Sequence, residues 1–415
     1  MKLTKERLKT MLGVYACAFC FMGMMAPVPV ISQIAMQFPE TDIVLIQMIV
    51  STPPLLAAFA GMGVSAFLAH RFYKRYVALV SMGIMLLAGM SIFLFAHNSV
   101  YEVLVFSALF GIGFGGAQNS SDALLADYFI ESERSVVFGL FGVAVGLGGI
   151  IWPAVAGACA STGGWVNAYL SFLLIIPMFI ISFICLPKGK LEPKRKVNAL
   201  SNLPKLVIMI ACYCLVFNLA IQLYNTNVSL IVAESGLGGV AEASLATMTF
   251  NCAGLIGGVV VGPLFKAFKN RAIPITVCVS LIGLALVAFA SSLPMLCIGG
   301  FLMSFGQQAF IPLTGNFTAA NSEQAGRAFN LAFAQSGNTL GQALSPMVFG
   351  AAAAPLGGTI AAKLDIGIVM LVIVIVIGFI VFRKLTPKQV EEIERMEAFK
   401  RGEIEDASKD VIIEK

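Results

Sequence analysis

The sequence predicts an all-α membrane protein whose twelve transmembrane helices form two pseudo-symmetric six-helix bundles. Three observations lead to this prediction: an apolar composition, twelve long apolar stretches, and two halves that repeat each other. Of the 415 residues, 58% are hydrophobic and 12% charged, and the mean hydropathy is +0.90. Soluble domains carry about 25% charged residues, and one water-excluded core could not bury so much apolar surface. A bilayer removes this difficulty because lipid-facing side chains need no burial.

Each predicted span contains about 20 or more mainly apolar residues, the length that an α-helix needs to cross a bilayer. The first follows ten polar and basic residues and runs from Met11 to about Met36, which exceeds the roughly 7–15 residues of a signal-peptide core. It is therefore interpreted as a retained helix, which Pro27 and Pro29 are expected to bend. The spans lie near residues 11–36, 43–69, 77–97, 100–126, 136–161, 165–186, 205–233, 243–268, 273–292, 294–319, 327–353 and 364–383.

The basic residues gather on one side of this topology. With the amino terminus in the cytoplasm, 26 of the 27 Lys and Arg residues fall in cytoplasmic segments, and only Lys363 lies on the opposite side. Loops rich in Lys and Arg remain in the cytoplasm. The chain is therefore expected to be a multi-pass protein of the cytoplasmic (plasma) membrane, with both termini in the cytoplasm.

A basic, Pro-bounded segment, LPKGKLEPKRKVNALSNLP, divides the chain near its middle. The predicted organisation is therefore a six-helix bundle over residues 1–186, a cytoplasmic linker over 187–204, a second bundle over 205–385 and a cytoplasmic tail over 386–415. The mixed charges of the tail predict a solvated helix.

Two pairs of segments repeat between the halves. AFLAHRFYKR (66–75) and GPLFKAFKNR (262–271) each end an apolar helix with a basic turn, at an offset of 196 residues. GLGGIIWPAVAG (146–157) parallels TLGQALSPMVFG (339–350) at an offset of 193, and the identical pairs include Gly148/Gly341, Pro153/Pro346 and Gly157/Gly350. Either match is weak alone, but together they predict duplication. Two similar bundles can rock about a site held between them.

These repeats resemble those of the major facilitator superfamily, up to about Leu385. The loop after the second span is similar to the family signature G-x-L-a-D-R-x-G-R-R through Leu68, Ala69, Arg71, Lys74 and Arg75. It departs from the signature at three positions, where the family has Gly, Asp and Gly: Ala66, His70 and Tyr73. The second copy keeps Gly262, Leu264 and Arg271, with Lys266 at the acidic position.

The resemblance implies that these loops gate the cytoplasmic side. In the family the loop acid faces a helix amino terminus across the interface, where the helix dipole stabilises a carboxylate but not His70. Either the outward-open state is less favoured than usual, or Arg71 pairs with Asp127 or Glu133; an alternative is that the charges only anchor the loop in headgroups. The segment ADYFIESERSVVFGLF resembles the family's connection between the fourth and fifth helices. The gating candidates are His70, Arg71, Arg75, Asp127, Arg134, Lys266, Arg271 and Arg327.

The fifth span resembles the G-P-x-x-G-G pattern of proton-driven antiporters. The match rests on Pro153, Ala156 and Gly157, with Trp152 in place of the first Gly. The motif candidates in the fifth and eleventh spans are Trp152, Pro153, Gly157 and Pro346. Many antiporters also carry an Arg in the fourth helix, four residues before a Gly; here Ser107 precedes Gly111. No Lys or Arg is expected within a span core, which weakens the antiport reading but not transport itself.

Asp122 is the one Asp, Glu, Lys or Arg residue placed away from the ends of a predicted span, in the cytoplasmic third of the fourth. A charge in a span costs about 2.5–3.5 kcal/mol on insertion scales, so such residues are functional candidates. Asp122 is therefore the candidate coupling group. The alternative is a carboxylate near the interface that reaches water or caps a neighbouring element.

Amide side chains are abundant in the helices that, by resemblance, line a central cavity: the first, fourth, seventh and tenth. A lipid-facing amide without a partner would cost several kcal/mol, so these groups face protein or a wet cavity. Some will only join helices, at about 0.6 kcal/mol each. The candidate cavity residues are Gln118, Asn119, Asn218, Gln222, Tyr224, Gln307, Gln308, Gln335 and Asn338. Such an uncharged lining suits a neutral or amphipathic organic molecule.

The resemblance and this lining imply a secondary active transporter that moves a small neutral or amphipathic organic solute by alternating access, with proton coupling left open. The alternatives are a uniporter, or an exchanger or importer of an organic acid or other metabolite, and more remotely a non-transporting sensor. An enzyme is disfavoured because the two histidines, His70 and His97, fall on opposite sides and no nucleophile motif or metal cluster is present. We expect a monomer in lipid, with no metal, cofactor or nucleic acid.

Overall fold

The computed structural model describes residues 5–63, 68, 71–129, 131–189, 191, 204–322 and 327–382, and their regular structure is helical. The predicted linker lies largely, and the tail wholly, outside these residues. The helices are α1 (Lys5–Phe21), α2 (Ile31–Gln37), α3 (Ile43–Gly63), α4 (Lys74–Leu94), α5 (Val100–Tyr128), α6 (Glu131–Gly163), α7 (Ile175–Cys185), α8 (Lys205–Glu234), α9 (Val240–Phe268), α10 (Ala272–Ala288), α11 (Leu293–Ala320), α12 (Arg327–Ala353) and α13 (Ile360–Val381).

These helices correspond to the twelve predicted spans. The first span is α1 with α2, the sixth is a 3-10 helix (Trp165–Leu174) continued by α7, and every other span is one long α-helix. Ten stretches of the described residues are long and apolar enough to cross a membrane. The amide-rich α12 is not among the ten, although it is 27 residues long. The all-α membrane fold is thus confirmed, and the structure is consistent with twelve spans.

The first span is broken at its prolines, as predicted. Helix α1 ends at Phe21, and two 3-10 turns, Met22–Met25 and Val28–Val30, lead into α2. Proline supplies no backbone N–H for the helical ladder, and its ring clashes with the preceding turn. The segment around Pro27 and Pro29 therefore cannot continue as a regular α-helix.

The sixth span differs from the prediction because its first ten residues form a 3-10 helix. In that helix side chains three residues apart eclipse each other. Tyr169 and Phe172 have this spacing, and their rings stack with centroids 5.8 Å apart and planes inclined by 24°. Aromatic stacking along the helix therefore accompanies the tighter winding.

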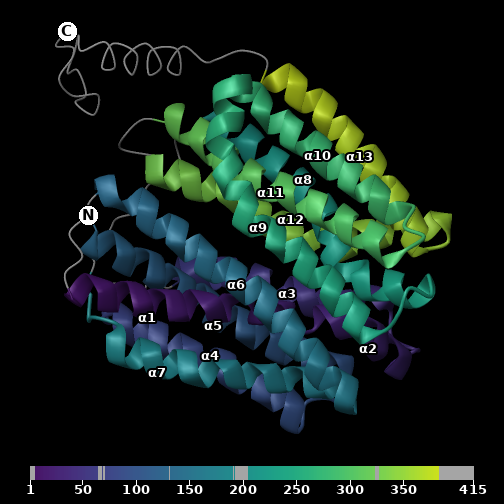
Figure 1. The fold of residues 1–415 in the computed structure, drawn as a ribbon, viewed down its shortest axis with the longest axis horizontal. Helices are drawn as coiled ribbons and strands as arrows, with labels where there is room; N and C mark the ends of the chain where they lie inside the picture. The colour runs from purple at the N-terminus through teal and green to yellow at the C-terminus, as the bar shows by residue number, and fades with distance from the viewer. Residues whose placement is uncertain are drawn as a thin grey trace.

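The helices form two bundles, with α1–α7 on one side and α8–α13 on the other (Figure 1). We call the end at which α1 and α4 begin the basic end; Lys74, Arg75, Lys266 and Arg271 lie there. The opposite end, which we call the acidic end, contains the connections at 38–42, 95–99, 235–239, 289–292 and 354–359. The charged residues at the acidic end are Glu40, Asp42, Glu102, Glu234, Glu242, Asp365 and Lys363.

The repeated glycines make equivalent contacts in the two halves. A β-carbon placed on Gly148 of α6 would lie 2.6 Å from the carbonyl oxygen of Phe19 in α1. In the other half, a β-carbon on Gly341 of α12 would clash with the carbonyl oxygen of Leu215 in α8. Only glycine permits such close backbone approach. The sequence repeat is therefore a repeat of helix packing.

Candidate functional site

A chain of amide hydrogen bonds joins three helices of the second half. Gln307 Nε2 of α11 donates to Asn218 Oδ1 of α8 at 2.7 Å, and Asn218 Nδ2 donates to Asn338 Oδ1 of α12 at 2.6 Å. Asn338 Nδ2 then donates to Gln335 Oε1, and Gln335 Nε2 donates to the carbonyl oxygen of Ile311 in α11 at 3.3 Å. The structure therefore brings four of the candidate cavity residues into one chain, which we call the amide chain.

Close packing of α12 on α8 places the amide chain. A β-carbon on Gly341 would lie 2.9 Å from Asn218 Cβ, so the missing side chain lets the helices approach. One turn further along α8, Gln222 Oε1 accepts a hydrogen bond from Asn225 Nδ2 at 3.3 Å. Both side chains are buried, and Asn225 Oδ1 has no hydrogen-bond partner in the described structure. Helix α8 therefore carries amide groups that have hydrogen-bond partners and one amide oxygen that has none among the described residues.

Two other candidates lie at the contact with α9. The Tyr224 hydroxyl donates to the carbonyl oxygen of Ala246 at 3.0 Å, and its ring stacks on Phe250 with centroids 5.0 Å apart. Gln308 lies against Gly254 and Gly257 of α9. These contacts hold neighbouring helices together and place both side chains apart from the amide chain.

The first-half candidates are arranged differently. Gln118 is exposed, whereas Asn119 Nδ2 donates to the carbonyl oxygen of Gly61 in α3 at 3.3 Å. Asp122 is half-buried on the same helix, α5, close enough to Cys17 of α1 for an electrostatic interaction. The candidate coupling group therefore lies between α5 and α1.

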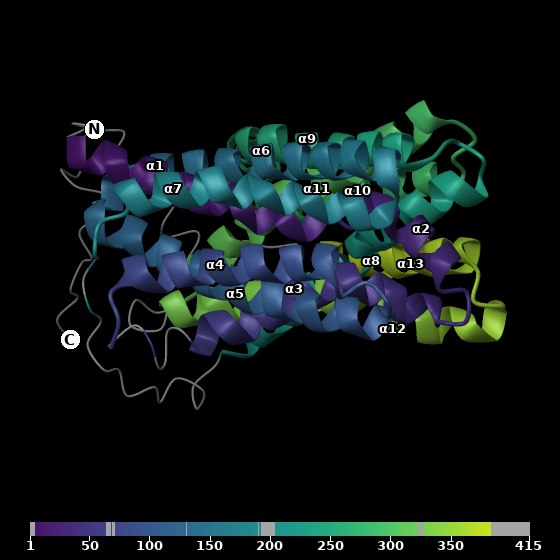
Figure 2. The same cartoon turned by 90° about the horizontal axis from the view of Figure 1, so that it is seen from below.

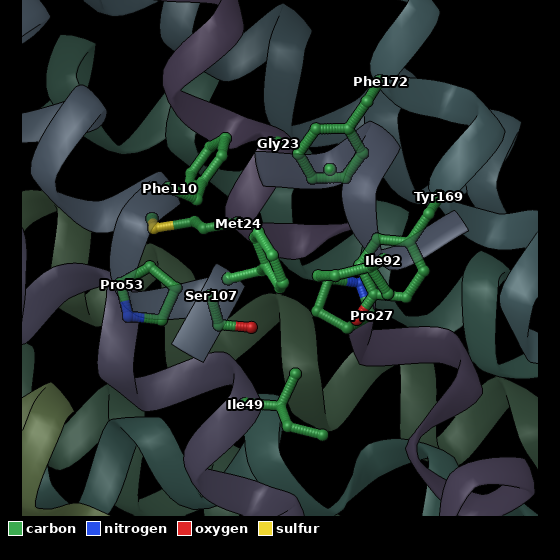
Figure 3. A pocket seen from close by; sticks show the side chains of 12 residues that line it. Gly23, Met24, Pro27, Ile49, Pro53, Ile92, Ser107, Phe110, Tyr169 and Phe172 are labelled. Carbon is green, nitrogen blue, oxygen red and sulfur yellow. The ribbon is translucent and has the colours of Figure 1, made fainter. Parts of the chain in front are cut away.

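An apolar pocket lies within the first half (Figure 3). Its cavity volume is about 10 Å³, room for about one water molecule. Its lining includes Met24, Phe110, Phe172 and two hydroxyl-bearing residues, Ser107 and Tyr169. The Tyr169 hydroxyl is buried and has no hydrogen-bond partner among the described residues. Ser107, the residue at the usual antiporter Arg position, therefore faces an apolar pocket.

The basic-end candidates make contacts within the first half. Lys74 Nζ pairs with Asp127 Oδ2 at 2.9 Å, so Lys74 takes the place that the sequence suggested for Arg71. Arg75 donates to the carbonyl oxygen of Phe183 at 2.6 Å and lies over the Phe183 ring. Arg71, Lys266 and Arg271 are exposed. His70, with the side chains of Arg134 and Arg327, lies outside the described residues.

The Pro and Gly motifs of the fifth and eleventh spans lie at contacts between the halves. Gly157 of α6 abuts Ser244 of α9, and Gly350 of α12 abuts Val44 of α3. Pro153 and Pro346 lie inside these helices. Trp152 points inward instead, and its Nε1 donates to the carbonyl oxygen of Phe19 at 3.0 Å.

Helices α6 and α9 of the two halves run side by side (Figure 2). Gly139, Gly142, Gly146 and Gly149 share one face of α6 by their spacing. A β-carbon on Gly146 would lie 2.7 Å from Leu255 Cδ2, and one on Gly149 would lie 2.8 Å from Asn251 Oδ1. Beside Gly139 and Gly142, nearer the basic end, no atom of the described residues lies within 4 Å. The contacts of this glycine face with α9 are therefore those of Gly146 and Gly149.

Lys363 lies at the end of the last span and not in a span core, but its side chain is buried. Helix α13 begins at Ile360, four residues before the predicted span, and Lys363 is only 2% exposed in its first turn. Its partner is Gln47 of α3 in the other half. The one signal in the sequence was its isolation as the single basic residue on its side of the membrane.

Comparisons with known proteins agree with this architecture. The sequence profile of the Major Facilitator Superfamily matches residues 11–282 and 206–412. Over 116 residues the chain is 28% identical to the multidrug transporter protein MdtP of Bacillus subtilis (strain 168), a match that covers 26% of this chain and 20% of that protein.

Solved structures show the same fold. The chain is similar to a bacterial homolog of the human lysosomal transporter Spinster in an inward-facing, unoccupied conformation, with a TM-score of 0.74 and 15% identity over 93% of this chain and 100% of that one. It is also similar to the nucleoside transporter NupG, with a TM-score of 0.71 and 12% identity over 91% of this chain and 100% of that one. For the POT family transporter PepTSo the TM-score is 0.72, with 11% identity over 92% of this chain and 98% of that one. These identities show the fold alone. Because the profile covers well over half of its length, the chain belongs to the Major Facilitator Superfamily, whose members are membrane transporters and not enzymes.

Proposed function

We propose that the chain is a secondary active transporter that carries a small neutral or amphipathic organic solute across the cytoplasmic membrane. The observation that supports this proposal is the amide chain in the second half. An amide both donates and accepts hydrogen bonds, so Asn218, Gln307 and Asn338 can exchange partners with a neutral polar group and need no counter-charge. In the first half, the apolar side chains of Met24 and Phe110 would contact the other side of an amphipathic solute.

The contacts between the halves support alternating access. Among the described residues they run from the middle of α6, where Gly149 abuts Asn251, to the acidic end, where Ser32 of α2 and Ser229 of α8 are hydrogen-bonded with oxygens 2.8 Å apart. Toward the basic end, no atom of the described residues lies within 4 Å of a β-carbon placed on Gly142. With the basic end in the cytoplasm, as the Lys and Arg distribution predicts, this conformation is open inward. Rocking of one bundle against the other would reverse the opening.

Counterflow into proteoliposomes containing the purified chain tests the substrate class. The panel comprises neutral, cationic and anionic organic solutes, and includes amphipathic drugs because one relative is a multidrug transporter. We expect uptake of neutral or amphipathic compounds. Uptake confined to inorganic anions or polyanions, or no flux for any compound, would contradict the proposal.

A pair of variants on α11 tests the role of the amide chain. Gln307→Ala removes the donor to Asn218, so apparent affinity should fall about fivefold to tenfold, the worth of roughly one hydrogen bond. Asn321→Ala is the matched control, because Asn321 Nδ2 donates to the carbonyl oxygen of Phe317 in its own helix. Equal kinetics in the two variants would remove the amide chain from the binding site.

Asp122 is proposed as the group that couples transport to protons. Asp122→Asn should lose substrate accumulation driven by a pH gradient while it keeps counterflow, because exchange at equilibrium needs no net proton movement. Glu102→Gln, which changes an exposed acid at the acidic end, is the control. Gradient-driven accumulation by the Asp122→Asn variant would assign the coupling to another residue.

A further inference from the structure

Three side chains at the acidic end form a hydrogen-bonded chain between the two halves. Lys363 Nζ of α13 donates to Gln47 Oε1 of α3 at 3.3 Å. Gln47 Nε2 donates to Asn227 Oδ1 of α8 at 2.7 Å, and Asn227 Nδ2 donates to the carbonyl oxygen of Leu223 at 2.8 Å. Gln47 comes from the first half, and Lys363 and Asn227 come from the second. A separation of the halves at this end therefore breaks both bonds of Gln47.

The direction of this chain is determined at both of its ends. A Lys ammonium can only donate, and a backbone carbonyl can only accept. Gln47 must therefore present its side-chain oxygen to Lys363 and its nitrogen to Asn227. Asn227 must present its own nitrogen to the carbonyl oxygen of Leu223. Gln47 satisfies both groups in one orientation, so a hydrocarbon side chain at this position leaves two buried polar groups without partners.

Burial of the Lys363 ammonium removes its hydration and so raises the free energy of the closed state. Lys363 and Gln47 are 2% and 1% exposed. The hydrogen-bond partner of Lys363 is a neutral amide at a long distance, and it returns only part of the free energy lost on dehydration of a charge. The acids whose fields reach Lys363 are Asp42, just before α3, and Glu234, at the end of α8. Opening of the acidic end would hydrate the ammonium in the presence of these carboxylates.

We infer that Gln47 and Lys363 form a latch at the acidic end, in which the hydrogen bonds of Gln47 favour the closed state and the buried charge of Lys363 favours opening. The latch rests on the proposed alternation between two states. It lies near the contact of the 3-10 turn Val28–Val30 with α8, where Ser229 Oγ donates to the carbonyl oxygen of Pro29 at 2.8 Å. The two opposing contributions make the closed state stable yet readily released.

Three variants separate the two contributions. Gln47→Leu leaves the Lys363 ammonium and the Asn227 oxygen buried without partners, so the acidic end should open. Lys363→Met removes the charge at similar length and leaves only the Gln47 oxygen unpaired, so the end should stay closed. The double variant Gln47→Leu/Lys363→Met removes the charge that drives opening, and it should recover closure.

Hydrogen–deuterium exchange of the full chain in lipid nanodiscs measures the opening. We expect Gln47→Leu to raise exchange in residues 28–50 and 222–240 about tenfold or more, the effect of at least one unpaired buried group. Lys363→Met should match or fall below the native chain, and the double variant should return to within about twofold of it. The matched control is Gln37→Leu, which breaks a hydrogen bond from Trp165 within the first half and should leave exchange in 222–240 unchanged.

Two results would overturn the latch: unchanged exchange in Gln47→Leu, or a double variant as open as Gln47→Leu, which would indicate lost packing. If Gln47→Leu does not fold, Lys363→Met alone decides, because a rise in exchange there contradicts the inference. The readout needs no substrate. Failure of the transport assay and failure of the latch are therefore separate outcomes.

Discussion

The two halves make the same helix contact with different side chains. In the first half, a β-carbon on Gly148 would meet the Phe19 carbonyl and, at 3.1 Å, Met22 Cβ. In the second half, the equivalent Gly341 meets the Leu215 carbonyl and Asn218 Cβ. Position 22 plus the offset of 196 is position 218, so Met22 and Asn218 are counterparts. The duplicated backbone contact has been kept, while the side chain beside it is apolar in one half and polar in the other.

This difference extends outward from the shared contact. Beside Gly23, the residue after Met22, the neighbours are aromatic: a β-carbon there would lie 3.1 Å from the Phe110 ring and 3.4 Å from the Trp152 ring. Around Asn218 they are the amides of the amide chain. A pseudo-symmetric scaffold can therefore present an apolar surface from one bundle and hydrogen-bonding groups from the other, as an amphipathic solute requires.

The largest expected effect concerns what the halves share. Gly148→Val and Gly341→Val should each lower the free energy of unfolding by about 3 kcal/mol or more, because the added side chain meets a backbone carbonyl that cannot move aside. Thermal unfolding in detergent measures both. Gly139→Val is the control, since open space lies beside Gly139. If only one of the two substitutions destabilised the protein, the packing repeat would not be equivalent.

The next effect concerns what the halves do not share. Asn218→Leu leaves Gln307 and Asn338 without a common partner, and unpaired buried groups cost roughly 1–3 kcal/mol each. Transport efficiency should fall about tenfold to a hundredfold, because a loss of roughly 1–3 kcal/mol in the binding site changes a rate or affinity by about that factor. Met22→Leu, at the counterpart position, should stay within about twofold because similar apolar volumes exchange at little cost. Initial rates of counterflow distinguish the two, and equal losses would erase the proposed division between the bundles.

The smallest effect sharpens the comparison at a second pair of positions. Trp152 and Ser345 occur at the same place in the repeat, and each donates to a carbonyl of the adjacent helix: Phe19 at 3.0 Å and Leu219 at 2.7 Å. Ser345→Ala should lower the free energy of unfolding by about 1 kcal/mol, the net contribution of one hydrogen bond. Trp152→Phe should cost somewhat more, because ring volume is lost as well. Unfolding temperatures that rank the two in the opposite order would contradict this account.

Much of the architecture could be predicted because it depends on composition and local pattern. Hydropathy placed the spans, and proline chemistry predicted a bend in the first span, although not that α1 would end at Phe21. The 3-10 start of the sixth span was not predicted, since it reflects ring stacking of Tyr169 on Phe172 within the packed bundle. The first turn of α13 was missed because Lys363 counts against hydropathy, although burial against Gln47 makes it part of the helix.

The candidate site could be predicted in its chemistry but not in its pairing. An amide in a membrane helix must face protein or water, so the sequence alone indicated Asn218, Gln307 and Tyr224 as inward-facing. It could not indicate that Asn218 and Gln307 bond each other while Tyr224 bonds Ala246 of α9. Those partners lie 89 and 22 residues away, and rotation of a helix by a fraction of a turn would exchange one partner for another.

The sequence by itself determined that this chain crosses a membrane repeatedly and that its halves are duplicates, because the bilayer imposes a fixed length and composition on every span. Only the tertiary structure decided which side chains join the halves at the acidic end, which amides are joined, and that Lys363 is buried against the other half. Those outcomes depend on contacts between residues distant in the chain, which no local pattern records.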